Sequence, residues 1–455
     1  MYDMDKFLLS YLEKKYDVRK ETPLYEIAEK LLQRLWQGSV CIPVEGNLAN
    51  SKAVGKKGDI RPLIFDEGNL YIQRYFVYQT RILNKIEELL ENKKIHIITG
   101  GPGTGKTSSL AEIIKNRLNE KILLAAPTGK AALRMRESLS NRGIKLEAKT
   151  LHRLLGYKHL SVNFRHTKEN PLEADIIAID ECSMIDLPMM SKLLDAVPNN
   201  CDLYLLGDKN QLASVEAGSV FADICRKYRN IYKELKINYR AEEAPGIEKM
   251  SKQILENSIE NFDNENVRYF ENAQLESKFP GWYENLFKAE SYGEALKFLK
   301  TFQILCATKV GKNGTQHINR ELCNLARKEK WTPIIITENN YQQNLFNGDV
   351  GVKDKERAYF HVGENEIRTF PLLTLPAYEP AFAITIHKSQ GSEYERVAVV
   401  YPNRERENED EQIFLTKELL YTAITRAKKE CFIFGNREVL ANSCKREIFR
   451  ASGIK

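Results

Sequence analysis

The sequence predicts an α/β protein with two parallel-sheet blocks in one chain. Between about residues 76 and 235, short apolar runs alternate with amphipathic stretches, and the same alternation returns after about residue 300. Short apolar runs separated by helices are typical of strands in a parallel sheet that is covered on both faces. A chain of 455 residues is also too long for one core and suggests two to four domains.

The apolar runs of both blocks are expected to be buried strands. In the first block they are KIHIITG (94–100), KILLAAP (121–127), ADIIAIDE (174–181) and CDLYLLGD (201–208). In the second block they are FQILCAT (302–308), AFAITIHKSQG (381–391), RVAVVYP (396–402) and ECFIFGN (430–436). Helices are expected at 107–119, 129–141 and 187–197, where apolar residues recur at helical spacing.

We expect three domains, with boundaries at residues 1–75, 76–235 and 236–455. The first is expected to be mainly helical, with an extended segment near Val40 to Val44. Two insertions interrupt the α/β rhythm. Residues 156–172 alternate like a hairpin, and residues 338–378 have the turns and short strands of a small β module.

Charge and cysteine content limit the classes of function. A net charge of +6 permits nucleic-acid binding but does not argue for it. Eight scattered cysteines with no C-x-x-C pair make a zinc ribbon or an iron–sulfur cluster unexpected. No secretory signal or membrane-spanning run is apparent, so a reducing cytoplasm is the expected compartment.

A glycine-rich loop joins the first expected strand to the next helix. Residues 100–107 fit G-x-x-x-x-G-K-[ST], in which backbone N–H groups and the helix N-terminus surround a phosphate chain. We expect Lys106 to reach the β- and γ-phosphates of ATP, and Thr107 to ligate Mg²⁺. The expected nucleotide-binding residues of the loop are Gly100, Gly101, Pro102, Gly103, Thr104, Gly105, Lys106, Thr107 and Ser108.

Hydrolysis requires acidic and polar groups beside this loop. Asp180 is expected to hold Mg²⁺, and Glu181 to activate the attacking water. Gln211, after the next strand, is expected to sense the γ-phosphate. Arg240 and Arg426 are candidates for positive charge supplied by the second block. If both reach the γ-phosphate, ATP lies between the two blocks and hydrolysis opens the gap.

The ordered motifs resemble those of superfamily 1 helicases, most closely the RecD branch. They are GGPGTGKT, APTGKAA, KTLHRLLG, DECSM, GDKNQLASV, NYR, ITIHKSQGSEY and YTAITRA, from about residue 95 to the end. The resemblance implies two RecA-like domains and an ATP-driven motor on DNA, in a group associated with 5′→3′ travel. It also implies that 158–166 is a pin hairpin that separates strands, and that 338–378 is an SH3-like module.

The flanking segments resemble the RecD subunits of RecBCD-type enzymes. LLQRLWQGSVCIPV, PLIFDEGNLYIQRYFVYQT and the ending FRASGIK carry this likeness. It implies RecB- and RecC-like partners, with the N-terminal region docking on the latter, and a role in double-strand break repair and recombination. The chain is short for such a subunit, and no nuclease site of its own is apparent.

The resemblance assigns further residues. Gln79 lies where the family reads adenine, although a solvated helix glutamine is an equal alternative. Contacts to the backbone of single-stranded DNA are implied for Pro127, Thr128, Gly129, Lys130, Thr150, His152, Thr385, His387 and Ser389. A structural role is the alternative for His152. Gln390, Gly391 and Glu393 complete the motif that couples ATP to DNA.

Three other functions remain open. The chain could be a freestanding RecD-like helicase or a helicase fragment of a conjugative relaxase. A relaxase needs a tyrosine beside a histidine cluster, and the seven histidines are scattered. A regulatory ATPase that gates a nuclease partner is the third possibility, and the complete acidic pair at Asp180 and Glu181 argues against an inactive ATPase.

Overall fold

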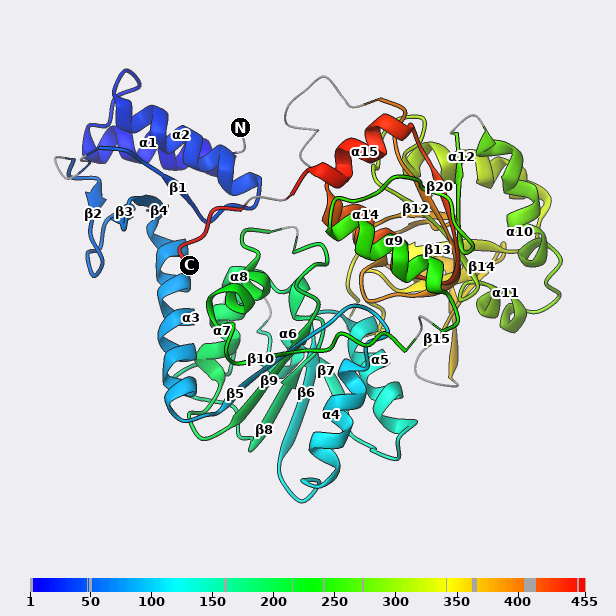
Figure 1. Cartoon of the computed structure of the whole chain (residues 1–455), viewed down its shortest axis with the longest axis horizontal. Coiled ribbons are helices and arrows are strands. Elements are labelled where there is room, and N and C mark those ends of the chain that lie inside the picture. Colours follow the sequence, from blue (N-terminus) through cyan, green and yellow to red (C-terminus); the bar gives the residue numbers. More distant parts are fainter. Residues whose placement is uncertain are drawn as a thin grey trace.

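The computed structural model describes residues 3–46, 48, 51–158, 161, 163–214, 216–239, 242–271, 274–340, 342–361, 366–404, 415–447 and 450–454. These residues form one four-stranded, one six-stranded and two five-stranded sheets. Figure 1 shows an N-terminal unit above α3, a first α/β block below it, and a second α/β block beside both. None of the helices in these ranges is both long and apolar enough to cross a membrane.

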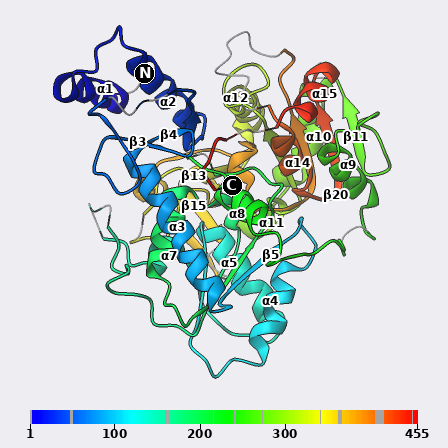
Figure 2. The same cartoon turned by 60° about the vertical axis from the view of Figure 1, so that its left-hand side comes forward.

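The N-terminal unit combines two helices with a small sheet, and Figure 2 shows it set apart from the two blocks. α1 (Asp3–Tyr16) is followed by α2 (Pro23–Trp36), which begins at a proline whose fixed φ suits a first helical turn. The sheet has the order β1-β4-β3-β2. Its strands are β1 (Cys41–Pro43), β2 (Val54–Gly55), β3 (Leu63–Asp66) and β4 (Asn69–Ile72).

The first block (residues 73–234) is a parallel sheet with the order β10-β5-β9-β8-β6-β7. Its strands are β5 (Ile95–Thr99), β6 (Ile122–Ala126), β7 (Ala148–Thr150), β8 (Ile176–Ile179), β9 (Asp202–Gly207) and β10 (Tyr232–Glu234). Its helices are α3 (Gln73–Glu91), α4 (Lys106–Lys115), α5 (Gly129–Ser140), α6 (Leu151–Leu154), α7 (Leu187–Ala196) and α8 (Val220–Lys227). The four strands predicted for this block are confirmed.

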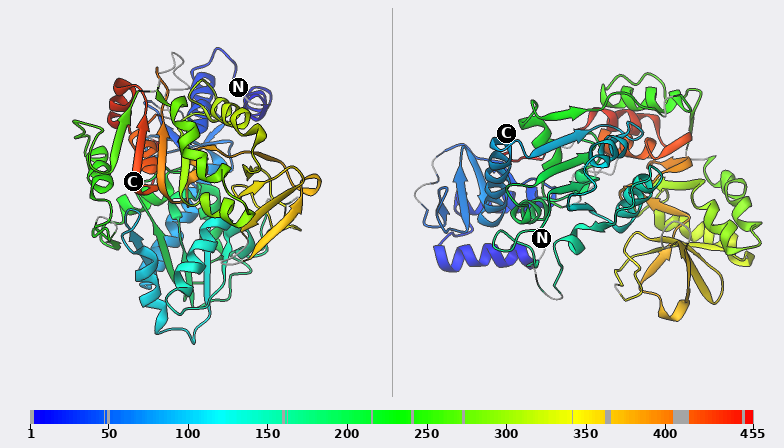
Figure 3. Two further views of the ribbon diagram at one scale, coloured as in Figure 1. Left: turned by 90° about the vertical axis from the view of Figure 1, so that its right-hand side faces the viewer. Right: turned by 90° about the horizontal axis from the view of Figure 1, so that it is seen from below.

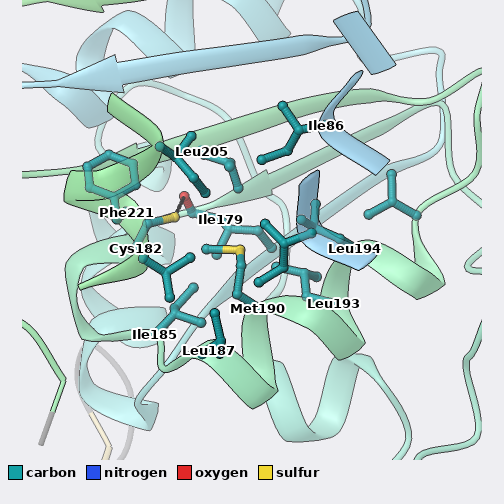
Figure 4. Close-up of a cluster of buried hydrophobic side chains, with 14 of the residues drawn as sticks. Ile86, Ile179, Cys182, Ile185, Leu187, Met190, Leu193, Leu194, Leu205 and Phe221 are labelled. Carbon is teal, nitrogen blue, oxygen red and sulfur yellow. Dashed lines mark hydrogen bonds between the residues drawn. The ribbon is translucent and has the colours of Figure 1, made fainter. Parts of the chain in front are cut away.

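Two apolar clusters cover the two faces of this sheet. On one face, Ile86 of α3 and Met190 of α7 pack on Ile179 of β8 (Figure 4). On the other face, Leu110 of α4 packs with Ala178 of β8. Neighbouring β8 residues therefore face opposite cores, which explains why this strand is a continuous apolar run rather than an alternating one.

The second block (residues 245–445) is a parallel sheet with the order β11-β20-β19-β12-β18. Its strands are β11 (Val267–Phe270), β12 (Phe302–Cys306), β18 (Ala383–Thr385), β19 (Tyr394–Val400) and β20 (Ala427–Phe434). Its helices are α9 (Pro245–Leu255), α10 (Phe279–Phe287), α11 (Tyr292–Phe298), α12 (Thr315–Leu325), α14 (Lys417–Ile424) and α15 (Arg437–Lys445). The predicted strands of this block are confirmed as well.

An antiparallel sheet is inserted between α12 and β18, and it projects from the second block in Figure 3. Its order is β16-β15-β14-β13-β17. The strands are β13 (Thr332–Ile336), β14 (Val350–Lys353), β15 (Arg357–His361), β16 (Ile367–Pro371) and β17 (Tyr378–Pro380). The sheet thus begins before and ends after the expected 338–378, because its first and last strands pair with each other.

The hairpin expected at 156–172 is represented by a single antiparallel bridge. Tyr157 pairs with Phe164, and residues 159, 160 and 162 lie outside the described part of the chain. Backbone bonds from Arg165 to Gly156 and from His166 to Leu155 hold the base of this excursion. Its role as a pin remains a prediction.

The C-terminal segment, residues 450–454, returns from α15 to the N-terminal half of the chain (Figure 1). The Val40 amide donates to the Ala451 carbonyl at 2.7 Å. The Gly453 amide donates to Oε1 of Gln79 on α3 at 2.8 Å. This segment therefore joins the second block to both the N-terminal unit and the first block.

Candidate active site

A cavity of about 1020 Å³ lies at the carboxyl ends of the first-block strands, where the second block faces them. The predicted residues that line it are Pro102, Gly103, Thr104, Gly105, Lys106, Thr107, Ser108, Asp180, Glu181, Gln211 and Arg426. The same wall includes Glu393. Arg240 lies outside the described residues, so its predicted role has no structural counterpart here.

The glycine-rich loop has the backbone that its sequence predicts. Gly103 and Gly105 have φ values of 81° and 82°, a region that favours glycine. α4 begins directly afterwards at Lys106, so its first amides face the cavity. The Lys106 ammonium donates to the carbonyls of Gly100 and Gly101 at 2.6 and 3.0 Å. The lysine is therefore held over the loop by bonds that a phosphate can replace.

Asp180 and Glu181 form an acidic pair at the end of β8. Glu181 has a φ of 54°, a left-handed conformation that costs a non-glycine residue on the order of 1–3 kcal/mol. The Glu181 amide donates to Oδ1 of Asp180 at 2.8 Å. Burial, with the Glu181 charge acting in the same direction, raises the pKa of Asp180 to about 6. Strain and burial thus place two carboxyl groups in one cavity, where a cation would favour their ionised forms.

Gln211 follows β9 and reaches the cavity with a spare acceptor. Its side chain is buried, and no hydrogen-bond partner meets Oε1 within the described ranges. Its neighbour Asp208 is also buried and accepts a bond from Tyr421 Oη of α14 at 2.9 Å. A buried amide oxygen without a partner is costly, so it marks a place where a ligand or water completes the site.

The loop that carries Gln211 is fastened to the second block. The Leu212 amide donates to Oγ1 of Thr422 at 2.9 Å, and Nε2 of Gln390 donates to the Leu212 carbonyl at 2.7 Å. Gln390 is thus buried in the contact between the blocks and does not line the cavity. Gly391 also lies outside the cavity wall, with its carbonyl accepting a bond from Arg134 at 2.9 Å.

Arg426 is supplied to the cavity by the second block, as its sequence context predicts. Only 1% of the residue is exposed. Nε donates to the Thr422 carbonyl and Nη1 to the Ser392 carbonyl, both at 3.1 Å. Nη2 has no hydrogen-bond partner among the described residues. The guanidinium is therefore fixed by two bonds with a third donor group left for an anion.

Sequence reasoning did not single out Arg134 or Tyr239. Arg134 of α5 forms an ion pair with Glu393 of the second block at 2.5 Å, within the wall of the cavity. The Tyr239 amide donates to the Gly103 carbonyl at 3.2 Å, and its exposed ring lies against Gly105. Their positions in the sequence could have identified them. Arg134 lies one helical turn after the APTGK motif, and Tyr239 is the aromatic residue next to Arg240.

The predicted strand-binding residues of the first block meet at one edge of its sheet. Thr128 caps α5 and Thr150 caps α6, each by accepting a bond from a backbone amide. Because β6 and β7 are parallel neighbours, these two helix N-termini lie at the same edge. Burial lowers the pKa of His152, whose ring lies edge-on to Tyr157 and Phe164, so this residue also has a structural role. Pro127, Gly129 and Lys130 belong to the same turn as Thr128.

The corresponding residues of the second block are less accessible. Thr385 ends β18, and its hydroxyl accepts a bond from the Lys388 amide. Burial lowers the pKa of His387 to about 4. Ser389 is fully buried, with its hydroxyl bonded to the Ile386 carbonyl at 2.7 Å. The structure therefore places Thr385 and His387 near the surface and Ser389 inside the loop.

Gln79 does not line the cavity. It is buried on α3, where its amide meets Gly453 and Tyr71. A side chain added at Gly453 would lie 2.3 Å from Nε2 of Gln79, so the two segments are in tight contact. The expected contact of this glutamine with adenine is replaced by a contact with the C-terminal segment.

Comparison with known proteins adds family information. Residues 84–217 match the family described as AAA domain, and residues 380–434 match the UvrD-like helicase C-terminal domain. The chain is 34% identical to "RecBCD enzyme subunit RecD" of Mycolicibacterium smegmatis, covering 79% of this chain and 71% of that protein. It is 28% identical to the protein of the same name from Buchnera aphidicola subsp. Acyrthosiphon pisum, covering 96% and 90%.

Two further relatives differ more in length or sequence. An "ATP-dependent RecD2 DNA helicase" of Deinococcus radiodurans is 29% identical, but the match covers 76% of this chain and 48% of that protein. Among solved structures, the Pif1 helicase of Candida albicans is 15% identical with a TM-score of 0.44, covering 80% of this chain and 96% of that one.

The Arg134 ion pair yields the first prediction. Arg134→Ala removes the bond to Gly391 and the charge-assisted contact with Glu393, whose side chain is 8% exposed. Amide hydrogen exchange at residues 390–393 should accelerate by about 10–10²-fold, since bonds to charged groups contribute about 1.5–3 kcal/mol. Arg136→Ala, on another face of α5, is the matched control and should leave exchange there unchanged. Equal exchange in both variants would contradict an Arg134 contact that holds the blocks together.

Proposed function

This chain belongs to the RecD family of ATP-dependent DNA helicases, and we propose that it is the RecD subunit of a RecBCD-type helicase–nuclease that moves 5′→3′ on single-stranded DNA. The main support for motor activity is that the glycine-rich loop, the acidic pair and Arg426 all line one cavity between the two blocks. Its eight cysteines are all free, which supports a reducing cytoplasm as its compartment.

ATP binds in this cavity with a division of roles. Lys106 and the loop amides hold the phosphates, and Glu181 polarises the attacking water. Arg426 contacts the γ-phosphate through Nη2, which has no hydrogen-bond partner among the described residues, and Gln211 senses the γ-phosphate through the attacking water, which donates to its free Oε1. Arg240 is a further candidate for this contact. The exposed Tyr239 ring beside Gly105 offers a surface on which the base can stack.

The acidic pair fits a divalent cation. Asp180 and Thr107 both line the cavity, and they supply the carboxylate and hydroxyl oxygens that Mg²⁺ prefers. Burial and the Glu181 charge raise the pKa of Asp180 although Lys106 and Arg134 act in the opposite direction, so a bound cation would favour its ionised form. Magnesium bound there would neutralise phosphate charge during transfer.

Single-stranded DNA crosses the exposed ends of both sheets. The N-termini of α5 and α6, with Thr128 and Thr150, favour phosphate oxygens at the first block. Thr385 and His387 provide the second contact. Hydroxyl and amide groups at helix ends bind the sugar–phosphate backbone without reading bases, which suits a motor that must pass any sequence. The bonds between Leu212 and both Gln390 and Thr422 connect the DNA-binding residues of the second block to the nucleotide cavity.

The N-terminal unit serves as the docking surface for partner subunits. Phe7 of α1 and Trp36 of α2 are 68% and 54% exposed, which is unusual for large apolar side chains. Exposed aromatic residues are typical anchors of protein interfaces. The greater coverage of the RecBCD subunits than of the freestanding helicase also favours assembly with RecB- and RecC-like chains in the repair of DNA ends.

Removal of the catalytic groups tests the motor. Glu181→Gln should keep nucleotide affinity and lower turnover by about 10²–10⁴-fold, because proton transfer from water is lost. Lys106→Ala should lose nucleotide binding. ATPase assays with and without oligothymidylate measure both effects, and Lys115→Ala, exposed at the end of the same helix, is the control. Full turnover by Lys106→Ala, or no stimulation by single-stranded DNA, would refute the proposed motor.

Polarity is tested separately with tailed duplexes. A duplex with a 5′ single-stranded tail should be unwound in the presence of ATP and Mg²⁺, while a 3′-tailed duplex of the same sequence should remain intact. The blunt duplex provides the baseline, and Glu181→Gln provides the inactive control. Unwinding from the 3′ tail alone would overturn the assigned direction while leaving ATP hydrolysis unaffected.

Assembly is tested by co-expression with RecB- and RecC-like chains. The wild-type chain should co-purify with them, and Phe7→Glu should weaken recovery by about ten-fold, because it places a charge in an apolar contact. Leu118→Glu changes an exposed leucine of the first block and should leave recovery unchanged. A wild-type chain that is fully active and never recovered with either partner would favour the freestanding alternative.

A further inference from the structure

We propose that Gly129, Lys130 and Arg153 of the first block form a nucleotide subsite, and that loop 342–349 of the antiparallel sheet occupies this subsite by imitating one nucleotide. The ligand class is a single nucleotide unit within single-stranded DNA, so the inference rests on the proposed function. The loop joins β13 to β14, and Figures 1 and 2 both show the antiparallel sheet beside α5.

The aromatic ring of Phe346 takes the position of a base. The Arg153 guanidinium lies over this ring at 4.9 Å from its centroid. A second contact is with Gly129, where an added Cβ would approach the ring to 3.3 Å. Arginine stacks on nucleobases and on aromatic side chains through the same planar geometry. A base can therefore replace the Phe346 ring without rearrangement of Arg153.

The carboxylate of Asp349 takes the position of a phosphate. It is half-buried, and its charge acts on the Lys130 ammonium, although the two groups form no ion pair within 4 Å in the described part of the chain. Burial lowers the pKa of Lys130 to about 8, with Arg134 acting in the same direction. Burial likewise raises the pKa of Asp349 to about 6, although Lys130 favours its charged form. A phosphate carries the same sign of charge and, at ion-pair distance, would stabilise the charged lysine more strongly.

A third contact completes the likeness. Nη2 of Arg153 donates to Oδ1 of Asn344 at 2.9 Å, as it could to the carbonyl oxygen of a base. The loop thus offers an amide oxygen, a ring and an anion to three groups of the first block. Two of those groups, Gly129 and Lys130, lie in the segment that was assigned to strand binding from sequence alone.

Bonds within the antiparallel sheet also hold the shape of the loop. Oδ2 of Asp349 accepts a bond from the Phe346 amide at 2.7 Å. The Gly348 amide donates to the Ile336 carbonyl of β13 at 2.9 Å, with a φ of 95° at Gly348. The loop can therefore leave the subsite as a unit with its sheet, and its ring and carboxylate remain in register.

A strand must displace this loop before it can use the subsite. The measured affinity is then the intrinsic affinity reduced by the fraction of molecules in which the subsite is open. Weakening the loop should increase affinity, whereas weakening the first-block side of the subsite should decrease it once the loop no longer competes for the same groups. A loop that instead gripped the strand would produce losses of affinity on both sides.

Binding of a fluorescent oligothymidylate of about 15 nucleotides to the full chain separates these cases. Phe346→Ala and Asp349→Asn should each lower Kd by about five- to ten-fold, because they increase the open fraction. Arg153→Ala added to Phe346→Ala should raise Kd by about ten-fold relative to Phe346→Ala alone, the cost of one lost base stack in a subsite that is already open. Asp354→Asn is the matched control, since this carboxylate also caps a turn of the same sheet, through the Glu356 and Arg357 amides.

A higher Kd for Phe346→Ala or Asp349→Asn than for the wild type would overturn the imitation of a nucleotide, and so would an unchanged Kd. Hydrogen exchange of the unmodified chain gives an independent result, in which amides 345–349 should exchange faster with oligothymidylate bound. Slower exchange would also overturn it. If the wild type binds no oligothymidylate, the proposed function itself fails, and that result is distinct from normal binding without a loop effect.

Discussion

The buried contact between loop 208–212 and α14 is the interaction on which the motor arrangement depends. Asp208 accepts from Tyr421, and Leu212 bonds with both Thr422 and Gln390, all within a region closed to solvent. The same loop leaves β9 at Gly207, whose carbonyl accepts from the Gly100 amide at 3.2 Å. A shift at the phosphate loop must therefore either move the second block or leave buried polar groups without partners, which costs about 1–3 kcal/mol each.

The charges around the cavity make the contact responsive to nucleotide. Arg134 forms an ion pair with Glu393, and the charges of Asp180 and Glu181 also act on its guanidinium. Magnesium and a phosphate chain would alter the charge in the cavity. Because Arg134 and Glu393 both line its wall, this change would alter the strength of their ion pair. The strained backbone at Glu181 fits this picture, since strain is tolerated where the surrounding structure fixes a functional group.

The sequence predicted the parts of the site that depend on short segments. The glycine-rich loop and the acidic pair belong to motifs whose local structure is fixed by a strand end or a helix N-terminus, and Arg426 lies where α14 ends and β20 begins. Contacts between segments far apart in the chain could not be predicted from the sequence. The bond from Gly453 to Gln79, and the pairing of Arg134 with Glu393, depend on how the units pack. The predicted limits of the antiparallel sheet left out β13, whose place in the sheet depends on pairing with β17, a strand distant in the sequence.

Helix α5 is the element through which strand and nucleotide act on each other. Lys130 and Arg134 are four residues apart, so they lie on one side of the helix. Along this side, Lys130 lies near loop 342–349 and Arg134 contacts Gly391 and Glu393 at the cavity. A strand that displaces the loop and a nucleotide that attracts the Arg134 guanidinium therefore both change the contacts of one rigid helix. Their coupling needs no chain of intermediate residues, and thermodynamic linkage makes it reciprocal: whatever free energy DNA binding contributes to closing the nucleotide cavity, nucleotide binding contributes equally to opening the strand subsite.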